Sequence, residues 1–266
     1  HKTQDDYVKA KSKLFRIAAT SILNMDDSSY DVLKSKAGGK VLSYSLKNKN
    51  ADFNISSIGI EFPETFEFNL ENFLAAVAVV RTIGIDNKRI AAALETFKFP
   101  AGRQEMVYEK DFKVIIDFAH TPNSFARVLP ALKKTTSGRL IHVFGAAGAR
   151  DASKRPLMRQ ISAKSADLII LTAEDPRSEE IQTINEQIKL GIKDYMGELV
   201  EIPDRGDAIN YAVRSAKKGD TIVITGKGHE ESMNLGRGEV AWSDHKAVER
   251  ALRSGGFGGG FFQSRN

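Results

Sequence analysis

The sequence predicts an α/β protein whose second half forms a mostly parallel sheet. Short apolar runs rich in Val and Ile alternate there with helical patterns. The runs lie at residues 113–116, 140–144, 168–171 and 221–224, and the helical patterns at 123–133, 155–165, 179–194 and 206–217. Such alternation favours parallel strands covered by helices on both faces. The pattern changes at Pro100-Ala-Gly102, which predicts two domains, 1–101 and 102–254.

The first domain has a less regular pattern. A helical pattern opens it at residues 7–15, and β-like pieces follow around 40–45 and 53–60. An apolar helix is expected from about Leu70 to Ile83, with Gly84 ending it, and a shorter helix over 87–97. The Gly-rich stretch 255–266 has no periodicity, so a disordered tail is expected there.

Composition narrows the class of protein. The absence of cysteine excludes disulfides and thiolate metal sites and fits a reducing cytoplasm. No apolar run approaches the roughly 20 residues of a membrane-spanning helix, so no membrane insertion is expected. The net charge of +5 favours attraction to anionic small molecules such as nucleotides. Nucleic acid is not expected, because no Lys/Arg stripe interleaved with aromatic residues occurs. The chain starts at His1, so its true N-terminus is expected to be missing.

Four polar loops, two of which contain glycine, follow the predicted strands directly. They are Asp117–Pro122, Gly145–Asp151, Thr172–Arg177 and Gly226–Glu230. Ligands of open parallel sheets bind where strands end, so the four loops predict a site at one edge. The Gly145–Gly148 loop can bring backbone N–H groups close to an anion, and arginine forks suit carboxylates. No Gly-x-x-x-x-Gly-Lys-Ser/Thr loop is present. The residues alone therefore predict an anion-binding α/β domain, a transferase or a ligase.

Eight short strings stand out along the chain. They are Tyr7-x-x-Ala10-Lys11-x-x-Leu14-Phe15, Phe68-Asn69-x-x-Asn72-x-x-Ala75-Ala76, Gly102-Arg103-x-Glu105, Asp117-Phe-Ala-His120-Thr-Pro122, Arg150-Asp-x-x-Lys154-Arg155-Pro156, Asp175-Pro176-Arg177, Asp204-Arg205-x-x-Ala208-Ile209 and Gly226-Lys-Gly-His-Glu230. In this order they resemble a known family, the Mur ligases, and within it the MurE type, which adds the third peptide residue to UDP-N-acetylmuramoyl-L-alanyl-D-glutamate. The resemblance extends from His1 to Leu252.

The resemblance implies the end of a central ATP-binding domain over 1–101, followed by a Rossmann-like, amino-acid-binding C-terminal domain over 102–254. It implies ATP and Mg²⁺ as cofactors, with Lys11, carbamylated, as a Mg²⁺ ligand. Residues implied near ATP are Asn72, Arg103, Asp117 and His120. Residues implied in the pocket for the amino acid are Arg150, Asp175, Arg177, Gly226 and Glu230. Lys11, His120 and Lys227 are the expected catalytic residues.

The implied reaction is the ATP-dependent addition of a diamino acid, through an acyl phosphate, during peptidoglycan precursor synthesis in the cytoplasm. Because Arg177 can clamp a far carboxylate, meso-diaminopimelate is favoured over L-lysine, although Asp175 stands where diaminopimelate-adding members have a neutral amide. A monomer is expected. The family's phosphate loop, N-terminal domain and other Mg²⁺ ligands are missing, as are strand residues between Ile58 and Phe68, so the chain alone is expected to be inactive.

Two alternatives remain open at this point. One is another amide ligase of the same fold, of the folylpolyglutamate or cyanophycin type. The strings Asp175-Pro176-Arg177 and Gly226–Glu230 argue against it. The other is a non-catalytic binding protein, if the phosphate loop is truly absent.

Overall fold

The chain folds into two compact units, His1–Lys98 and Phe99–Asn266. The computed structural model describes residues 4–62, 67–191 and 195–257. Each unit has its own apolar core. The boundary falls after Lys98, beside the Pro100–Gly102 string where the sequence pattern changes. Within the described ranges, no helix has both the length and the apolar character needed to cross a membrane.

The first unit combines a small parallel sheet with helices. In chain order it contains α1 (Gln4–Ile17), β1 (Thr20–Asn24), α2 (Tyr30–Lys36), β2 (Lys40–Ser45), β3 (Phe53–Asn54), α3 (Glu67–Thr82) and α4 (Asn87–Glu95). The strands pair in the order β1-β2-β3, and α3 packs on them. The core of this unit contains Ile58, Leu74, Val77 and Ile90.

Two elements of this unit are missing from the sequence prediction, and one is shorter than expected. Strand β1 has polar residues at both ends, which hides its buried Leu23. Helix α2, seven residues long, was also missed. The β-like stretch 53–60 is a strand only at Phe53–Asn54, because the Asn54 side chain accepts the N–H of Ser56 at 2.9 Å and turns the chain.

The second unit is built on a six-stranded sheet with the order β4-β5-β9-β6-β7-β8. Its strands are β4 (Glu105–Glu109), β5 (Lys113–Asp117), β6 (Leu140–Phe144), β7 (Leu168–Leu171), β8 (Glu198–Glu201) and β9 (Thr221–Thr225). Strand β4 is antiparallel to β5, and the other neighbours are parallel. Strands β5, β6, β7 and β9 lie where the sequence predicts them, so the expected α/β class with a mostly parallel sheet is confirmed.

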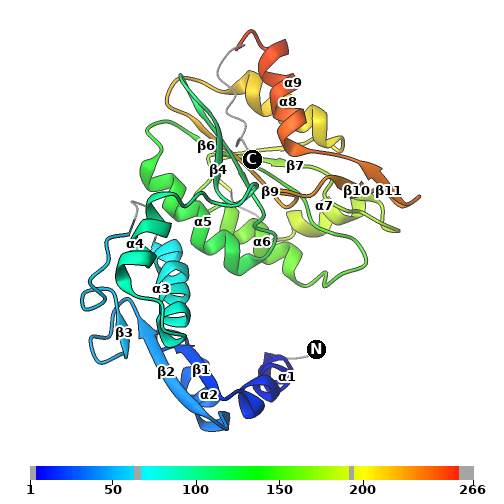
Figure 1. Ribbon diagram of the computed structural model, residues 1–266. Coiled ribbons are helices and arrows are strands. Elements are labelled where there is room, and N and C mark those ends of the chain that lie inside the picture. Colours follow the sequence, from blue (N-terminus) through cyan, green and yellow to red (C-terminus); the bar gives the residue numbers. More distant parts are fainter. Residues whose placement is uncertain (1–3, 63–66, 192–194, 258–266) are drawn as a thin grey trace. The chain divides into compact units, whose positions relative to one another are not determined.

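Helices cover both faces of this sheet (Figure 1). They are α5 (Pro122–Thr135), α6 (Lys154–Ser162) and α7 (Ile181–Lys189) on one face, and α8 (Arg205–Ser215) and α9 (Asp244–Ser254) on the other. The main core lies between the sheet and the α8–α9 layer. Helix α5 starts where expected, because Thr121 and Ser124 form a capping box and Pro122 occupies its first turn.

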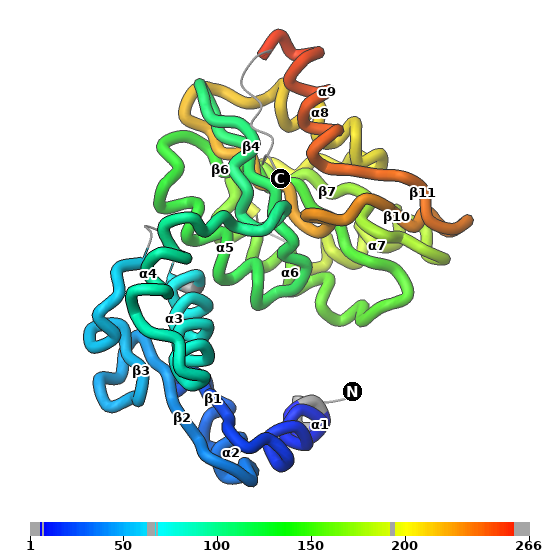
Figure 2. Tube along the Cα trace, viewed as in Figure 1, coloured from blue at the N-terminus to red at the C-terminus, as the bar shows by residue number. Residues whose placement is uncertain are grey.

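Several elements at the edges of this unit escaped the sequence prediction. Strands β4 and β8 carry Glu at both ends, which masks their apolar centres. The hairpin of β10 (Ser232–Asn234) and β11 (Glu239–Ala241), visible at one side of the chain trace in Figure 2, and helix α9 were also missed. Helix α7 is shorter than the predicted 179–194, of which residues 192–194 lie outside the described part.

The tail was expected to be disordered from Gly255 onward, but its first three residues, 255–257, are packed against the rest of the second unit. The N–H of Gly255 donates to Ala251 at 2.9 Å, and the N–H of Phe257 donates to Leu252 at 2.9 Å. The ring of Phe257 packs edge-on against Phe112, with 5.1 Å between centroids. Aromatic burial therefore extends the packed region beyond Ser254. Residues 258–266 lie outside the described residues.

Candidate functional site

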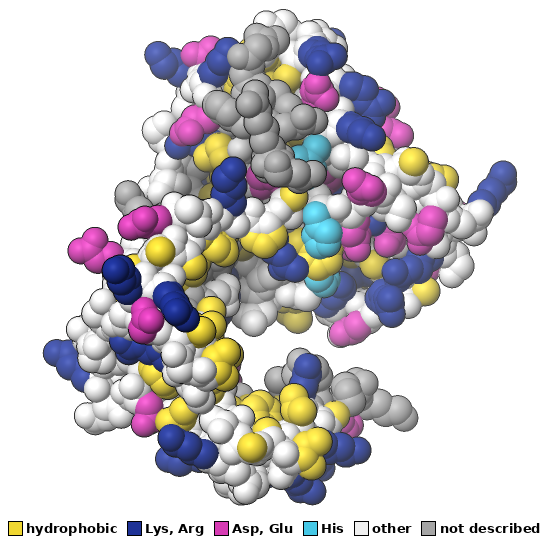
Figure 3. Space-filling model, in the orientation of Figure 1, with side chains coloured by type: hydrophobic (Ala, Val, Ile, Leu, Met, Phe, Trp, Pro, Cys, Tyr) yellow, Lys and Arg dark blue, Asp and Glu magenta, His cyan; other side chains and the backbone are white. Residues whose placement is uncertain are grey.

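A cleft of about 410 Å³ opens at the carboxyl ends of the parallel strands in the second unit. All four predicted loops contribute to its lining, as expected for an open parallel sheet, whose ligands bind where the strands end. The lining residues are Phe118, His120, Ala147, Arg150, Asp151, Lys154, Glu174, Asp175, Arg177, Gly226 and Glu230. This set contains the five residues expected to bind the amino acid, together with His120. Charges of both signs are interspersed over the visible face of this unit (Figure 3).

Glycine lets the loops after β6 and β7 approach each other closely. A Cβ atom on Gly148 would lie 1.9 Å from the Pro176 carbonyl oxygen, so no larger residue fits there. The N–H of Gly148 donates to the Asp175 carbonyl at 2.8 Å, and that of Ala149 donates to the Glu179 carboxylate at 2.6 Å. In the Gly145–Gly148 loop, which was expected to bind an anion, the N–H of Gly148 therefore already has a partner within the protein, as does the N–H of the adjacent Ala149.

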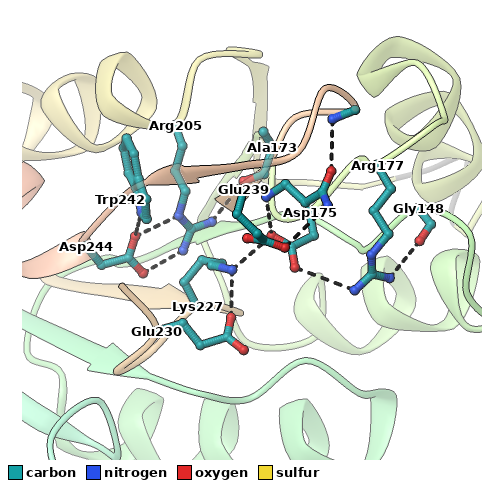
Figure 4. Close-up of polar contacts among 12 residues, drawn as sticks. Gly148, Ala173, Asp175, Arg177, Arg205, Lys227, Glu230, Glu239, Trp242 and Asp244 are labelled. Carbon is teal, nitrogen blue, oxygen red and sulfur yellow. Dashed lines mark hydrogen bonds and ion pairs between the residues drawn. The ribbon is translucent and has the colours of Figure 1, made fainter. Parts of the chain in front are cut away.

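Lys227 lies between two carboxylates of the cleft (Figure 4). Its Nζ is 2.9 Å from Asp175 Oδ1 and 2.6 Å from Glu230 Oε2, and its side chain is only 2% exposed. Burial alone would lower the pKa of Lys227, but its hydrogen bonds with Glu230 and Asp175 raise it. The lysine thus stays charged and fixes both carboxylates. Its expected catalytic role stays a prediction, since its ammonium is directed at these partners.

Asp175 is an anion held by the protein. Burial would raise its pKa, but the hydrogen bond from Lys227, the N–H of Asn234 and the charge of Arg177 lower it overall. Lys227 contributes most to neutralising Asp175, because its Nζ is 2.9 Å from Asp175 Oδ1, whereas the Arg177 Nη2 atom is 3.7 Å from Asp175 Oδ2. The signal for this pairing is absent from the sequence, where the two residues stand 52 positions apart.

Arg177 adopts an uncommon backbone conformation, with φ of 52°. Its N–H donates to the Asn234 carbonyl at 3.0 Å, which ties the loop after β7 to the β10–β11 hairpin. Its guanidinium donates to the Gly148 carbonyl at 3.0 Å and lines the cleft (Figure 4). Arg150 lines the same cleft with an exposed side chain. The cleft therefore offers two arginines beside the anchored carboxylates of Asp175 and Glu230.

A buried arginine holds together the ends of two strands that form the cleft. Arg205, at the start of α8, donates to the Ala173 carbonyl at 3.1 Å and to the Thr225 carbonyl at 2.9 Å. Asp244 at the start of α9 binds the same guanidinium through two hydrogen bonds of 2.7 and 2.8 Å. Ala173 follows β7 and Thr225 ends β9, so Arg205 fixes the starting points of two loops. The sequence prediction included Arg205 only as part of a family string.

Sequence reasoning also missed Glu174 as a site residue, although it stands next to Asp175. Glu174 lines the cleft and is 7% exposed. Burial raises its pKa to about 7. No local pattern reveals this, because the burial comes from loops that are distant in sequence.

Asp117 and Arg103 lie outside the lining of the cleft, near the start of the second unit. Asp117 is buried and accepts the N–H groups of Gln104 at 2.8 Å and Ala119 at 2.7 Å, and burial raises its pKa. The Arg103 guanidinium stacks over the Phe118 ring at 4.8 Å. His120 packs edge-on against the same ring and does line the cleft. Their proposed contacts with a nucleotide stay predictions.

Lys11 and Asn72 belong to the first unit. Lys11 lies on α1 and Asn72 on α3, and both side chains are exposed. Across the described ranges, no group of three or more His, Cys, Asp or Glu residues could hold a metal ion. The role of Lys11 as a Mg²⁺ ligand stays a prediction.

The fold and cleft define an α/β domain of the open-sheet class with a charged cleft at its carboxyl edge. Residues 102–228 match the family model of the Mur ligase glutamate ligase domain. The chain is 36% identical to a UDP-N-acetylmuramoyl-L-alanyl-D-glutamate–2,6-diaminopimelate ligase from Caldanaerobacter subterraneus, over 95% of this chain and 56% of the relative. Its counterpart in Aquifex aeolicus is 38% identical, over 96% of this chain and 56% of the relative.

A solved structure of a UDP-N-acetylmuramoyl-L-alanyl-D-glutamate–2,6-diaminopimelate ligase is similar with a TM-score of 0.58 and 31% identity. The similarity covers 96% of this chain and 57% of that one. The second unit of this chain contains a Mur ligase C-terminal domain, and the chain as a whole is similar to the ligases named above. It spans a little over half the length of the curated relatives that it matches.

Proposed function

We propose that this chain is part of an ATP-dependent ligase that joins a diamino acid to UDP-N-acetylmuramoyl-L-alanyl-D-glutamate in peptidoglycan precursor synthesis. The names of the relatives given above state that those enzymes act on this precursor. The observation that carries the proposal is the cleft, where Arg150 and Arg177 stand beside the anchored carboxylates Asp175 and Glu230. A diamino acid has both carboxylate and ammonium groups, so this arrangement is complementary to it. A cytoplasmic location is part of the proposal, and the lack of cysteine fits it.

In the proposed reaction, ATP phosphorylates a carboxylate of the precursor, since a free carboxylate does not accept an amine. The amino group of the diamino acid then attacks the acyl phosphate, and phosphate leaves. The second unit holds and orients the amine, which turns a collision between two molecules into a reaction between fixed groups. Closure of this domain over the acyl phosphate would exclude water, which would otherwise hydrolyse the acyl phosphate.

The two parts of the chain have different tasks in this proposal. Residues 102–254 form the amino-acid-binding domain, and residues 1–101 form the end of the ATP-binding domain, with a hinge near Pro100–Arg103. Asn72 contacts the nucleotide from the first part, and Arg103, Asp117 and His120 do so from the second. Mg²⁺, when bound, offsets charge on the transferred phosphoryl group. The carbamate of Lys11 supplies one oxygen ligand, which suits this hard cation.

The diamino acid that we favour is meso-diaminopimelate, and Arg177 is the reason. Its guanidinium lines the cleft and can form a charge-assisted bond with the far carboxylate, which L-lysine lacks. Such a bond contributes about 1.5–3 kcal/mol, or roughly ten- to a hundredfold in selectivity. Asp175 does not oppose this strongly, because Lys227 neutralises it. Asp175 and Glu230 are left to face the ammonium groups.

Two other functions remain as alternatives. A ligase of the folylpolyglutamate or cyanophycin type has the same fold, but no contact in the cleft favours it. A non-catalytic binding protein would use the same cleft without ATP. Both alternatives can be told from the proposal by whether the complete protein uses ATP to join meso-diaminopimelate or L-lysine to the dipeptide.

The test is a ligase assay on the complete protein, with phosphate release measured for the UDP-linked dipeptide and each amine. We expect phosphate release with meso-diaminopimelate, at a kcat/KM roughly ten- to a hundredfold above that for L-lysine. Arg177→Ala should remove most of that preference, whereas Arg253→Ala, a change of an exposed arginine on α9, should leave it intact. A preference for L-lysine that persists in Arg177→Ala contradicts the selection argument. Binding of the dipeptide without any turnover contradicts the proposal that the protein is a ligase.

A further inference from the structure

Glu174 is the buried carboxyl group of the cleft. It is 7% exposed, lines the cleft, and follows β7 beside the residues that hold the amino acid in the proposed function. Gly226, with φ of 110°, presses against it. A Cβ atom on Gly226 would lie 3.1 Å from Glu174 Cγ and 3.2 Å from its Oε2. The loop after β9 thus holds the carboxyl group in one place.

One oxygen of this carboxyl group is unsatisfied. Among the residues that the structure describes, Glu174 Oε2 is buried and has no hydrogen-bond partner. Polar atoms buried in native proteins nearly always have a partner, and a buried charged group without one is costly. The adjacent Asp175, in contrast, accepts hydrogen bonds from Lys227 and from the N–H of Asn234. Because Glu174 lines the cleft, a buried acceptor of this residue that lacks a protein donor is suited to a donor that a bound ligand brings.

The charges around Glu174 leave it poised between two protonation states. Lys154 on α6, Arg205 on α8 and Lys227 after β9 favour the carboxylate, whereas burial and the neighbouring Asp175 favour the protonated form. Burial is the largest of these effects, and the pKa rises to about 7. At neutral pH the group can therefore both accept a proton and release it, which is the property that a general base needs.

We propose that Glu174 is a catalytic residue that takes a proton from the ammonium group of the incoming amino acid. This inference rests on the proposed ligase function. An ammonium group has N–H donors and no acceptor, so it fits an unpartnered carboxylate oxygen. The ammonium nitrogen has no free electron pair, so it cannot attack a carbonyl carbon until one N–H bond has broken. The proton moves to Glu174 Oε2 and the bonding pair stays on nitrogen.

The remaining steps balance without any further reactant. The nitrogen pair forms the C–N bond at the acyl carbon, and the bond from that carbon to the phosphate oxygen breaks. Phosphate leaves with that electron pair and takes the second proton from nitrogen. Glu174 then releases the first proton to solvent. The overall change is an ammonium ion and an acyl phosphate giving an amide, hydrogen phosphate and one proton.

Asp175 and Glu230, the two cleft carboxylates that Lys227 holds, are unsuited to this step. Asp175 is hydrogen-bonded to Lys227, and these contacts lower its pKa, which makes it a weak base. Glu230 is also bound by Lys227, at 2.6 Å. Both are suited to binding an ammonium group without taking its proton. The arrangement assigns binding to the carboxylates that Lys227 holds, and proton transfer to the one that it does not hydrogen-bond.

The test compares Glu174→Gln with the unchanged complete protein and with Glu186→Gln, a matched change at an exposed position of α7. Two products are measured with ATP and the UDP-linked dipeptide. The first is the amide formed with the diamino acid. The second is the hydroxamate formed with hydroxylamine, which is neutral at neutral pH and needs no base. We expect kcat for amide formation to fall by about 100-fold or more in Glu174→Gln, with KM little changed and hydroxamate formation intact.

The pH profile provides a second measurement. In the unchanged protein, kcat/KM for the amine should rise with pH through about 7, because only the carboxylate form accepts a proton. This rise should be missing in Glu174→Gln and present in Glu186→Gln. An equal loss of amide and hydroxamate, or a rise in KM at constant kcat, overturns the role of Glu174 as a proton acceptor. If the unchanged protein forms neither the amide nor the hydroxamate, the proposed ligase function fails, and the role of Glu174 fails with it.

Discussion

Replacing Asp244 by alanine removes the partner of a guanidinium that has no exposed side-chain surface. Arg205 and Asp244 are both 0% exposed and joined through two hydrogen bonds of 2.7 and 2.8 Å. Burial would lower the pKa of Arg205, but Asp244 outweighs burial and raises it, so the arginine stays charged. The variant therefore leaves a buried positive charge with only two carbonyl groups as acceptors. Asp244 also accepts the indole N–H of Trp242 at 2.9 Å, which is lost as well.

Breaking a buried ion pair from one side costs about 3–5 kcal/mol, and we expect Asp244→Ala to lower the free energy of unfolding by this amount. Urea denaturation followed by tryptophan fluorescence measures it. Trp242 is the only tryptophan of the chain, so its signal reports on the second unit. Circular dichroism provides an independent record, because the variant also changes the surroundings of Trp242.

The control is Glu249→Ala on the same helix, α9. Glu249 pairs with Arg253 at 2.6 Å, with side chains 30% and 75% exposed. Exposed pairs of this spacing contribute about 0.3–0.5 kcal/mol. The double variant Arg205→Met/Asp244→Ala should lose less than the sum of its single changes, because it leaves no buried charge without a partner. A loss in Asp244→Ala that is no larger than in the control would refute the assignment of Arg205 as the residue that fixes the strand ends.

Two further predictions concern protonation and the first unit. His142 is fully buried between Ser162 and Thr225, and burial lowers its pKa to about 3. Between about pH 3 and 6.5 the unfolded chain then binds more protons than the folded chain. The free energy of unfolding should therefore fall as the pH drops below about 6.5, and His142→Gln should lack this decrease. An equal pH dependence in both proteins contradicts this role of His142. In the complete protein, Lys11→Ala should lose ligase activity that added bicarbonate does not restore, and near-normal turnover would make Lys11 an ordinary surface residue.

The sequence allowed the position of the site to be predicted because that position follows from local patterns. Apolar runs identify buried parallel strands, and a polar residue such as Asp117 or a glycine such as Gly145 identifies where each strand ends. The topology of an open sheet then brings these ends to one edge. Strand β8 was missed for the same reason that the other strands were found. The prediction depended on an unbroken apolar pattern, and the glutamates at both ends of β8 interrupt it.

The contacts inside the site could not be predicted in this way, because they join residues from loops that are distant in sequence. Lys227 and Asp175 form an ion pair across 52 positions, and Arg205 and Asp244 form one across 39. Each loop shows which charges it carries, but which charges meet depends on how the glycines let the loops pack. Gly148 shows this, since it permits a contact between two loops that any Cβ atom would block.

Glu174 and Asp175 illustrate what this difference means for function. The two carboxyl groups are adjacent in sequence, yet their pKa values move in opposite directions. Asp175 meets Lys227 and a backbone N–H, and so it remains an anion. Glu174 packs on the bare backbone of Gly226, and no residue in the described part of the chain forms a hydrogen bond with its Oε2. Neighbouring carboxyl groups whose environments separate their pKa values are suited to separate tasks, one to binding a cation and the other to exchanging a proton. In this cleft the separation depends on a lysine that reaches one carboxylate and on a glycine that contributes no donor to the other.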